Sequence, residues 1–443
     1  MQAVRVGRRV TFGLATIACL VTVTVNSGNA FAEEFDPAEI TSDLARLTSA
    51  QNAVKAYARD YDVTATRAQA VLEMQARGTD LSEVLPEALG SSFGQVWFRD
   101  GRYDVYVQKG GDVALARELL AERGVSSTAI VREVPWNAAD LRRELGAVHG
   151  RLPHQSDADE AFVATADGGL EITLARSASD ATARAAADAG RRTASEAGVP
   201  VDVVRADHEL GTPTRMYALP GYGGPPWIAG MLNRPTDDSA GSCTTGFYAR
   251  AIGNYFLTAG HCIGNRTPYR KVFRSPGSPV NVGIDVGGFD NTWGDAGVIA
   301  SWDVMAPYPA MLDWTNPVNP AIAVFGASLS TNGFFYCHTG VGSHLAGHSA
   351  TTCGTNRGYG PITFPGYPNE VFYRQIYRGN TCGWVGDSGG PVWDPFIGHA
   401  IGIFEGGQGG SAFNGGCGTN MILYYTDAKP AAATLGVTIA TIY

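Results

Sequence analysis

The stretch CGWVGDSGGPVWD, Cys382 to Asp394, sets one serine among small and acidic residues. A glycine and an aspartate precede Ser388, and two glycines follow it. Glycines on both sides of a residue allow tight turns and let another chain approach closely, which suits a serine that acts as a nucleophile. The same composition is also common in surface turns. The rest of the chain has to decide between a reactive serine and an ordinary turn.

A histidine and an aspartate in suitable surroundings stand upstream of this serine. The segment CTTGFYARAIGNYFLTAGHC, residues 243–262, is extended and apolar before His261, and its spacing would let Cys243 and Cys262 join two neighbouring strands. A histidine fixed by such a crosslink suits a general base, because imidazole titrates near neutral pH, although it could also cap a strand end. In FDNTWGDAGVIAS, Asp295 precedes an apolar stretch that should be buried.

The two motifs LTAGHC and GDSGGPV, in the chain order His, Asp, Ser, resemble those of the chymotrypsin-like serine proteases. The cysteine positions are similar to those of the streptogrisin and alpha-lytic protease group. This resemblance implies an all-β protease domain of two six-stranded antiparallel β-barrels, with the active site in the cleft between them. The disulfides expected on the same basis are Cys243–Cys262, Cys337–Cys353 and Cys382–Cys417.

The resemblance also assigns a role to each residue of the proposed triad. Ser388 would attack the peptide carbonyl, and His261 would accept its proton and pass it to the leaving amine. Asp295 would orient the imidazole and support its positive charge, while Asp285 and Asp290 are the nearby alternatives for this acid. The substrates would be proteins or peptides, and no cofactor or metal is expected.

Two further segments would hold the substrate. The N–H groups of Gly386 and Ser388 would form the oxyanion hole, whose loss typically costs about 3–4 kcal/mol. The segment GIFEGGQ resembles the strand that pairs with substrate backbone, so the expected substrate-binding residues are Phe404, Glu405, Gly406 and Gly407. Glu405 stands where the family has a serine that supports the catalytic aspartate, and a carboxylate there would be repelled by that aspartate unless it points elsewhere or carries a proton. Relatives that cut after basic residues have an acid where this chain has Asn380, so we expect cleavage after uncharged residues of modest size.

The acid next to the serine, Asp387, raises a separate question. In the larger family this position is buried and meets a positive group, because an unpaired buried charge is costly. In the streptogrisin-like branch that group is an arginine directly after the cysteine matching Cys337, where this chain has His338. We therefore expect a protonated His338 to pair with Asp387, with Arg357 or the new N-terminus of the processed chain as alternatives.

The N-terminus predicts export. Residues 1–32 begin with arginines, continue with a short apolar run and end in Ala30-Phe31-Ala32, the pattern of a secretory signal peptide. A membrane anchor is the alternative, but the run is short for a span, so we expect no membrane partner. Six cysteines remain after removal of the signal, an even number that suits an oxidising, extracellular location.

Composition divides the exported chain into two parts. Residues 33–220 are acidic and free of cysteine, and they contain most of the formal net charge of −9; residues 221–443 contain all six remaining cysteines. The order strand, strand, helix, strand occurs twice, at about 90–135 and 160–207, after helices between Asp36 and Leu89, which predicts an α+β region of two similar lobes. The histidines of this region, His149, His154 and His208, stand in polar surroundings and are expected at the surface.

The acidic part could be an independent binding module or a pro-region. The resemblance favours a pro-region, because the alpha-lytic group carries a two-lobed one that acts as an intramolecular chaperone and inhibitor. Cleavage would then fall in the Pro- and Gly-rich linker, between Gly211 and Met231. Neither part has a basic patch that would indicate a nucleic-acid partner, and we expect a monomer.

Three other interpretations compete with a serine endopeptidase. His338, His344 and His348 lie between two cysteines and could form a zinc site, although intervening glycines and the exported context favour a disulfide instead. A protease fold without activity could serve as a binding protein, but such proteins normally lose a triad member. A secreted esterase would share the nucleophile and is excluded poorly by the sequence.

Overall fold

The computed structural model shows helices and strands before the linker and mainly strands after it. The expected signal peptide, most of the expected linker and Asn380 lie outside the residues that the structure describes. Within the described ranges, none of the helices combines the length and the apolar character needed to span a bilayer. The described residues are 43–152, 160–165, 168–206, 214–215, 229–235, 242–263, 269–273, 279–291, 294–301, 308–315, 321–362, 371–377, 381–409, 415–418 and 421–442.

Three helices occupy the region where the sequence predicts helices before the first lobe. α3 begins where the Thr64 hydroxyl accepts a hydrogen bond from the Arg67 N–H, and it ends at Gly78. Its buried residues are Ala68, Val71, Leu72 and Gln75, and their i, i+3, i+4, i+7 spacing places them on one side of the helix. The helices are α2 (Asp43–Asp60), α3 (Ala65–Arg77) and α4 (Leu81–Leu89).

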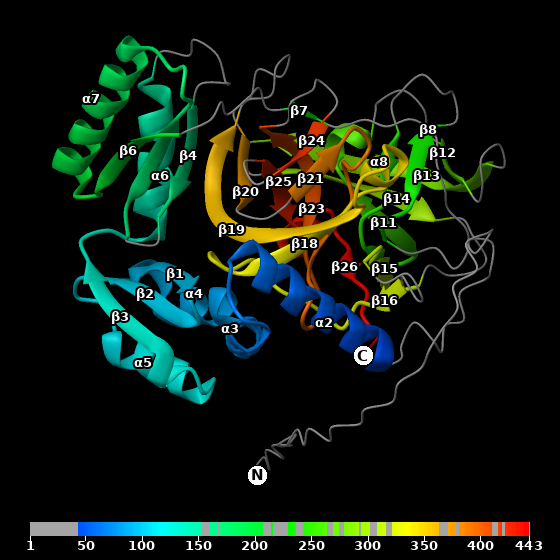
Figure 1. Cartoon of the computed structure of the whole chain (residues 1–443), viewed down its shortest axis with the longest axis horizontal. Helices are drawn as coiled ribbons and strands as arrows, with labels where there is room; N and C mark the ends of the chain where they lie inside the picture. Colours follow the sequence, from blue (N-terminus) through cyan, green and yellow to red (C-terminus); the bar gives the residue numbers. More distant parts are fainter. Residues whose placement is uncertain are drawn as a thin grey trace. The chain divides into compact units, whose positions relative to one another are not determined.

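Two β-β-α-β units follow, with the order of elements that the sequence predicts. In the first, Asp100 and Gly101 have φ values of 55° and 80°, as a two-residue hairpin turn requires, and the helix returns the chain so that the third strand lies parallel to the second. The second unit repeats this pairing (Figure 1). The elements are β1 (Phe93–Arg99), β2 (Arg102–Gln108), α5 (Val113–Glu122) and β3 (Ala129–Val134), then β4 (Glu160–Ala164), β5 (Leu170–Leu174), α7 (Asp180–Ala197) and β6 (Val201–Arg205).

A further helix, α6 (Ala138–Gly150), connects the two units. It buries His149, so the expectation of a surface histidine is wrong there, because that residue falls on the helix face that also buries Leu145 and Val148. The other two histidines of this region lie outside the described residues.

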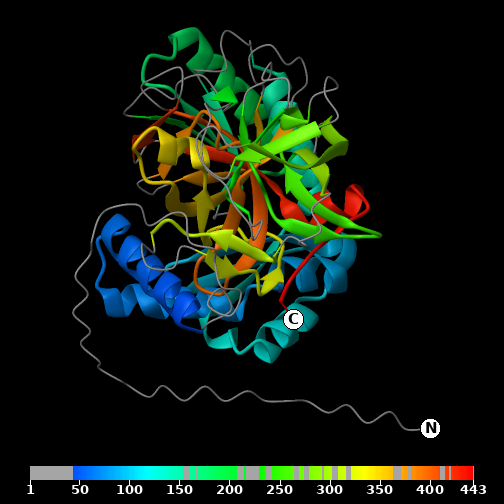
Figure 2. The ribbon, with the colours of Figure 1, turned by 90° about the vertical axis from the view of Figure 1, so that its right-hand side faces the viewer.

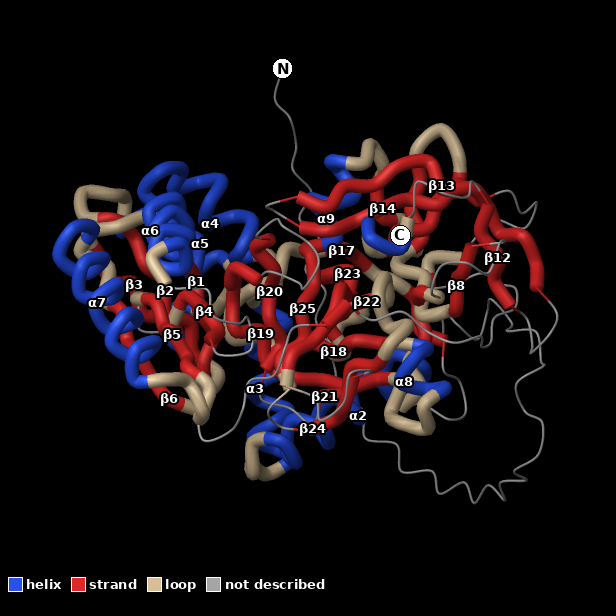
Figure 3. The backbone as a smooth tube through the Cα atoms, turned by 90° about the horizontal axis from the view of Figure 1, so that it is seen from above, coloured by secondary structure: helices blue, strands red, loops and turns tan. Residues whose placement is uncertain are grey.

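Beyond the linker the described elements are almost all strands (Figure 3). The first sheet has the order β26-β10-β11-β14-β13-β12-β8-β9, and its ends do not pair within the described residues. Of the two expected barrels, this one is therefore seen as an open sheet. Its strands are β8 (Leu232–Pro235), β9 (Cys243–Thr244), β10 (Tyr248–Arg250), β11 (Asn254–Thr258), β12 (Tyr269–Phe273), β13 (Pro279–Asn291), β14 (Gly294–Ser301) and β26 (Thr438–Ile439).

The second sheet closes into a six-stranded antiparallel barrel. Its order is β23-β22-β18-β19-β20-β25, and β25 pairs back onto β23. Trp393, Ile403 and Leu423 lie fully buried in its core, and β14 of the first sheet contacts β25, so the two sheets are neighbours (Figure 2). The strands are β18 (Phe335–Thr339), β19 (Thr351–Ile362), β20 (Val371–Tyr377), β22 (Pro391–Asp394), β23 (His399–Gln408) and β25 (Ile422–Asp427).

Short elements complete the structure. A two-residue strand from the linker pairs with β23, and the serine-containing loop runs between β21 and β22. The short elements are β7 (Thr214–Arg215), the 3-10 turn η3 (Gly260–Cys262), β15 (Ala310–Leu312), β16 (Ala321–Ala323), β17 (Gly326–Ala327), α8 (Val341–Leu345), β21 (Thr381–Trp384), β24 (Gly415–Gly418) and α9 (Ala428–Thr434).

The N-terminal helices share a hydrophobic core with the barrel, and Glu34–Tyr443 accordingly forms one unit. Gln75 of α3 is buried, its amide nitrogen donates to the Phe335 carbonyl at 3.0 Å and to Asp394 at 2.9 Å, and its amide oxygen accepts from the Phe335 N–H at 2.7 Å. Tyr57 packs edge-on against the Phe335 ring, with centroids 5.3 Å apart. A polar side chain and an aromatic one from the acidic part therefore cover β18 and β22.

Candidate active site

The structure brings His261 and Asp295 into direct contact. His261 lies in η3, shortly after β11, and Asp295 lies near the start of β14, the strand that pairs with β11. The Asp295 carboxyl accepts the His261 backbone N–H at 2.8 Å and bonds the ring Nδ1 with its other oxygen. The alternative acids, Asp285 and Asp290, lie on β13, where Asp290 is exposed. The structure thus pairs the favoured acid, Asp295, with the histidine.

A glycine makes this approach possible. A side chain at Gly260 would collide with the Phe289 carbonyl and lie 2.5 Å from the Asp295 carboxyl. Asp295 is fully buried, and its own N–H donates to the Thr426 hydroxyl of β25 at 3.0 Å. The carboxyl group of this aspartate is therefore fixed from η3 and its backbone from β25.

The loop around Ser388 answers the question of the glycines. Gly386 and Gly389 have φ values of 104° and 87°, a region that side-chain-bearing residues rarely adopt. A Cβ atom at Gly389 would collide with the Thr258 hydroxyl and the Thr244 carbonyl, so the loop passes too close to the first sheet for any larger residue. The Ser388 carbonyl accepts the Thr244 N–H at 2.7 Å. The glycines thus serve a close approach between the serine loop and the first sheet.

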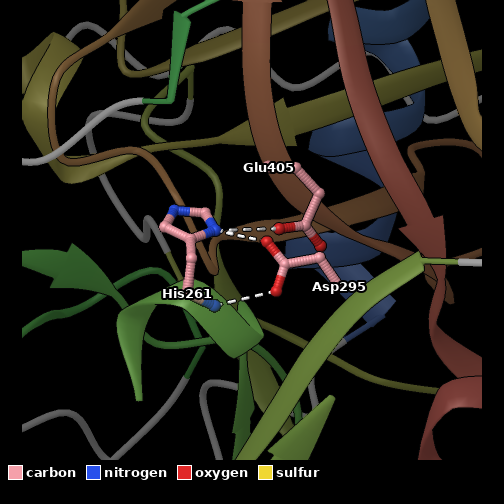
Figure 4. A group of neighbouring side chains, drawn as sticks. All are labelled: His261, Asp295 and Glu405. Carbon is pink, nitrogen blue, oxygen red and sulfur yellow. Dashed lines mark hydrogen bonds and ion pairs between the residues drawn. The ribbon is translucent and has the colours of Figure 1, made fainter. Parts of the chain in front are cut away.

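Glu405 contacts both the serine and the histidine. The Ser388 hydroxyl donates to the Glu405 carbonyl oxygen at 2.9 Å, and the Glu405 carboxyl lies 3.6 Å from His261 Nδ1. The carboxyl groups of Glu405 and Asp295 both point at this one ring nitrogen (Figure 4). The sequence predicts that Glu405 lies in the substrate-binding strand. In the structure its side chain is completely buried and faces the Nδ1 side of the His261 ring.

The neighbours of Glu405 on β23 point in different directions. Phe404 is buried, and its ring stacks on His338 with centroids 4.1 Å apart. Gly406 and Gly407 pair with Arg215 and Thr214 of β7. The two glycines thus hold an extended piece of the chain, whereas the phenylalanine packs into the barrel interior.

Asp387 is held by several donors. One of its carboxyl oxygens accepts the Ser343 N–H at 2.9 Å, and the other accepts the Ser343 hydroxyl at 2.6 Å and the Trp384 N–H at 2.8 Å. The His338 Nε2 atom lies 3.6 Å from the same carboxyl, as expected. The alternative partner Arg357 instead pairs with Glu171 of β5, so of these two basic residues it is His338 that lies against the Asp387 carboxyl. Sequence reasoning missed Ser343.

Room for Asp387 comes from two glycines of the α8 segment. A Cβ atom at Gly340 would overlap the Asp387 carboxyl, and one at Gly342 would overlap the Val385 carbonyl. Both glycines stand in the stretch CHTGVGSH, and their spacing is the signal in the sequence for this contact.

The three disulfides have the expected pairs, Cys243–Cys262, Cys337–Cys353 and Cys382–Cys417. The histidines between Cys337 and Cys353 do not converge. His344 stacks on Trp314 with centroids 4.3 Å apart, and burial lowers its pKa, while His348 packs against Trp384. Each ring has its own partner, which argues against a shared zinc site.

A different group of ligand-type atoms does converge. His261 Nδ1 and one oxygen each of Asp295 and Glu405 lie within 4.8 Å of one another. Such a group could hold a cation, but Nδ1 is already bonded to Asp295, and we assign no metal to it.

Comparison with known proteins finds proteases at low similarity. No family model matches the chain. Solved structures that it resembles include the alpha-lytic protease homolog N4, with 20% identity over 48% of this chain and 99% of that one and a TM-score of 0.37. Others are the MamO protease domain from Magnetospirillum magneticum (12% identity, 47% of this chain, 96% of that one, TM-score 0.32) and kallikrein-related peptidase 10 (15% identity, 47% and 94%, TM-score 0.27). All three are named as proteases or peptidases, and each alignment covers about half of the present chain.

Proposed function

We propose that the chain is a secreted serine endopeptidase in which Ser388 is the nucleophile, His261 the general base and Asp295 the orienting acid. The observation that carries this proposal is the pair of hydrogen bonds that the Asp295 carboxyl makes with His261, one to the ring Nδ1 and one to the backbone N–H. A carboxylate on Nδ1 keeps a proton there and leaves Nε2 as the basic nitrogen, which is what proton abstraction from a serine requires. The N–H groups of Gly386 and Ser388 would then stabilise the oxyanion.

A peptide substrate is favoured over an ester by the pairing of β7 with β23. Thr214 and Arg215 form an antiparallel strand on Gly407 and Gly406, so this edge accepts extended backbone. From Thr214 to Arg215 the chain runs toward Glu405, and Glu405 contacts Ser388. We therefore place the self-processing bond within the few residues after Arg215, inside the linker region expected from the sequence.

The same contacts support a pro-enzyme. Residues 1–32 would be the signal peptide, 33–220 a pro-region and 221–443 the protease domain, in which we assign the open first sheet to the other expected barrel. The pro-region would act as inhibitor through β7 and as folding aid through Gln75, which bonds two strands of the closed barrel. Barrels with many distant contacts fold slowly, so a preformed surface for β18 and β22 would shorten the search.

The test of activity is cleavage of casein and trimming of the chain itself by the secreted protein. We expect both in the parent and neither in Ser388→Ala, with Ser349→Ala as the matched control, because the Ser349 hydroxyl bonds the Thr351 carbonyl outside the site. Hydrolysis of a short-chain ester without casein cleavage would favour the esterase instead. Absence of both reactions in the parent would favour the inactive binding protein.

The test of the pro-region is refolding. Residues 228–443 alone should recover activity very slowly or not at all, and addition of residues 33–227 as a separate chain should rescue it. Introducing Gln75→Leu into the added chain should weaken the rescue, because the buried bonds to Phe335 and Asp394 are lost. Equal recovery with and without the added chain would contradict the proposal.

A further inference from the structure

We propose that Glu405 is a positioning residue for His261, and that it shares one proton with Asp295 so that Glu405 is a neutral carboxylic acid when the triad is active. This inference rests on the proposed function for its kinetic consequences. Its structural basis is the group of two carboxyls and one imidazole nitrogen, which is independent of what the substrate is.

The imidazole offers too few protons for two carboxylates. A neutral imidazole that acts as a base at Nε2 has one N–H, at Nδ1. That single donor faces two carboxyl groups: Asp295, which is bonded to it, and Glu405, whose Oε2 lies 3.6 Å away. Two buried carboxyl groups therefore converge on one imidazole N–H.

Charge repulsion between the two carboxyls leads to the assignment of a proton to one of them. Asp295 and Glu405 are both 0% exposed, and oxygens of the two groups lie within 4.8 Å of each other. Two carboxylates that share a buried site cannot both ionise cheaply, and one of them holds its proton well above the usual range, as in carboxylate dyads. Asp295 accepts the His261 backbone N–H in addition to the ring, which favours its ionised form. The proton is therefore assigned to Glu405.

The charged groups that the structure describes on the elements around β23 have contacts of their own. On β25, Asp427 pairs with Arg374 of β20; on β22, Asp394 accepts the Gln75 amide; on β18, His338 faces Asp387. Burial raises the pKa of the Tyr425 hydroxyl on β25, so that group is neutral. On α9, Lys429 pairs with Glu83.

Glu405 also contacts both reacting residues. Its backbone carbonyl accepts the Ser388 hydroxyl, while its side chain lies against His261. A neutral acid fills the space behind the imidazole without a second negative charge. An ionised Glu405 would repel the Asp295 carboxylate and disturb the alignment of His261. Activity should therefore fall as the pH rises through the pKa of Glu405.

The kinetic test compares three versions of the full-length chain, expressed and secreted: parent, Glu405→Gln and Glu405→Ala. Glutamine has the shape of the neutral acid and cannot ionise. We expect Glu405→Ala to lower kcat by roughly 10–100-fold with little change in KM, which is part of the roughly 10²–10⁴-fold that a well-positioned base contributes. Glu405→Gln should recover most of that loss, and its rate should keep the acid limb of the pH profile while losing the alkaline limb of the parent.

Three kinetic results would overturn the proposal. If Glu405 is ionised in the active enzyme, Glu405→Gln will move the acid limb to lower pH, because a negative charge beside His261 is removed. If its role is merely structural, both variants will lower the rate equally at every pH. An alkaline limb that persists unchanged in Glu405→Gln would also contradict it.

A second measurement does not depend on activity. In full-length Ser388→Ala, difference infrared spectroscopy at neutral pH should show carbonyl absorption of buried protonated carboxyls, and adding Glu405→Gln should remove the component that belongs to Glu405. Burial also raises the pKa of Asp313 and Asp394, so the readout is the difference between the two variants. Absorption that Glu405→Gln leaves unchanged would overturn the proposal. Because this protein cannot cleave anything, failure here is distinguishable from failure of the proposed protease function, which would show as an inactive parent.

Discussion

Two buried acids flank Ser388, and they are held in opposite ways. Asp387, on one side, accepts three hydrogen bonds from Ser343 and Trp384 and faces His338. Glu405, on the other side, faces a second carboxyl across one imidazole nitrogen. Hydrogen-bond donors surround the Asp387 carboxyl, whereas the Glu405 carboxyl shares a buried site with a second carboxyl and is, in our proposal, a neutral acid.

The largest expected loss of activity comes from a substitution of Asp295, whose carboxyl lies beside that of Glu405. Asp295→Asn should lower kcat/KM by about 10⁴-fold, because asparagine can donate to Nδ1 and favours the wrong tautomer. Steady-state kinetics on a peptide substrate measures this, with Asp290→Asn as the control on the exposed neighbouring strand position. A loss of only a few-fold would show that Glu405 can take over the orienting role, and the two carboxyls would then be equivalent.

On the Asp387 side, removing one donor tests how much the hydrogen bonds contribute. Ser343→Ala deletes the hydroxyl that bonds the Asp387 carboxyl at 2.6 Å, and a bond to a charged group is worth about 1.5–3 kcal/mol. We expect a lower free energy of unfolding and at least a tenfold loss of kcat if the oxyanion loop loosens, a ratio that about 1.4 kcal/mol produces. Urea unfolding and steady-state kinetics measure the two quantities, with Ser349→Ala as the control. If Ser343→Ala changes neither the free energy of unfolding nor kcat, the support of Asp387 comes from His338 and not from the Ser343 hydroxyl.

The difference between the two sides also shows where sequence reasoning succeeds. The motifs around His261 and Ser388 predict local geometry, because the glycines and cysteines they contain permit only a few close approaches, and the three disulfide pairs are confirmed. Glu405 could not be predicted in the same way. The pairing of β23 with β25 shifts register between Phe404 and Gly406. Such a bulge changes the direction of the Glu405 side chain relative to the one that regular strand alternation predicts.

Long-range contacts could not be predicted for a different reason. Gln75 stands on an ordinary amphipathic helix, and no residue beside it indicates that its side chain bonds Phe335 of β18, 260 residues later. The order of elements in the two N-terminal units is local and could be predicted, since each turn is marked by Asp-Gly or Gly. Closure of the first sheet is not seen among the described residues, so it stays a prediction.

Substitutions at His338 test whether a positive charge beside Asp387 supports activity and stability. An arginine keeps its charge at high pH, whereas a histidine loses it. We therefore expect His338→Arg to extend activity and thermal stability toward alkaline pH, and His338→Ala to weaken both at acidic pH. The measurement is the pH dependence of kcat/KM and of the melting temperature. If both variants have the pH profiles of the parent, His338 does not support Asp387 through its charge.

The smallest effect concerns Asp313, a third buried acid with three donors but no positive neighbour among them. Burial raises its pKa, and the bonds from Thr315 and Ser49 lower it only in part. Because the folded-state pKa lies above the unfolded one, stability is highest below the unfolded pKa and falls as the pH rises from that value to the folded-state pKa. Asp313→Asn should abolish this fall and raise the free energy of unfolding at neutral pH, by an amount on the order of 1 kcal/mol that is typical of single substitutions. Urea unfolding at acidic and neutral pH checks it, and a variant less stable than the parent at neutral pH would show that hydrogen bonds alone keep a buried acid charged.

The most direct test of the central claim, that Ser388 is a nucleophile activated by His261, is labelling with a serine-directed phosphonate followed by mass spectrometry of the labelled peptides. We expect a single adduct on Ser388 in the parent, and a loss of labelling in His261→Ala, because the base that removes the hydroxyl proton is gone. An adduct on another residue, or labelling of Ser388 at the parent rate in His261→Ala, would contradict the claim.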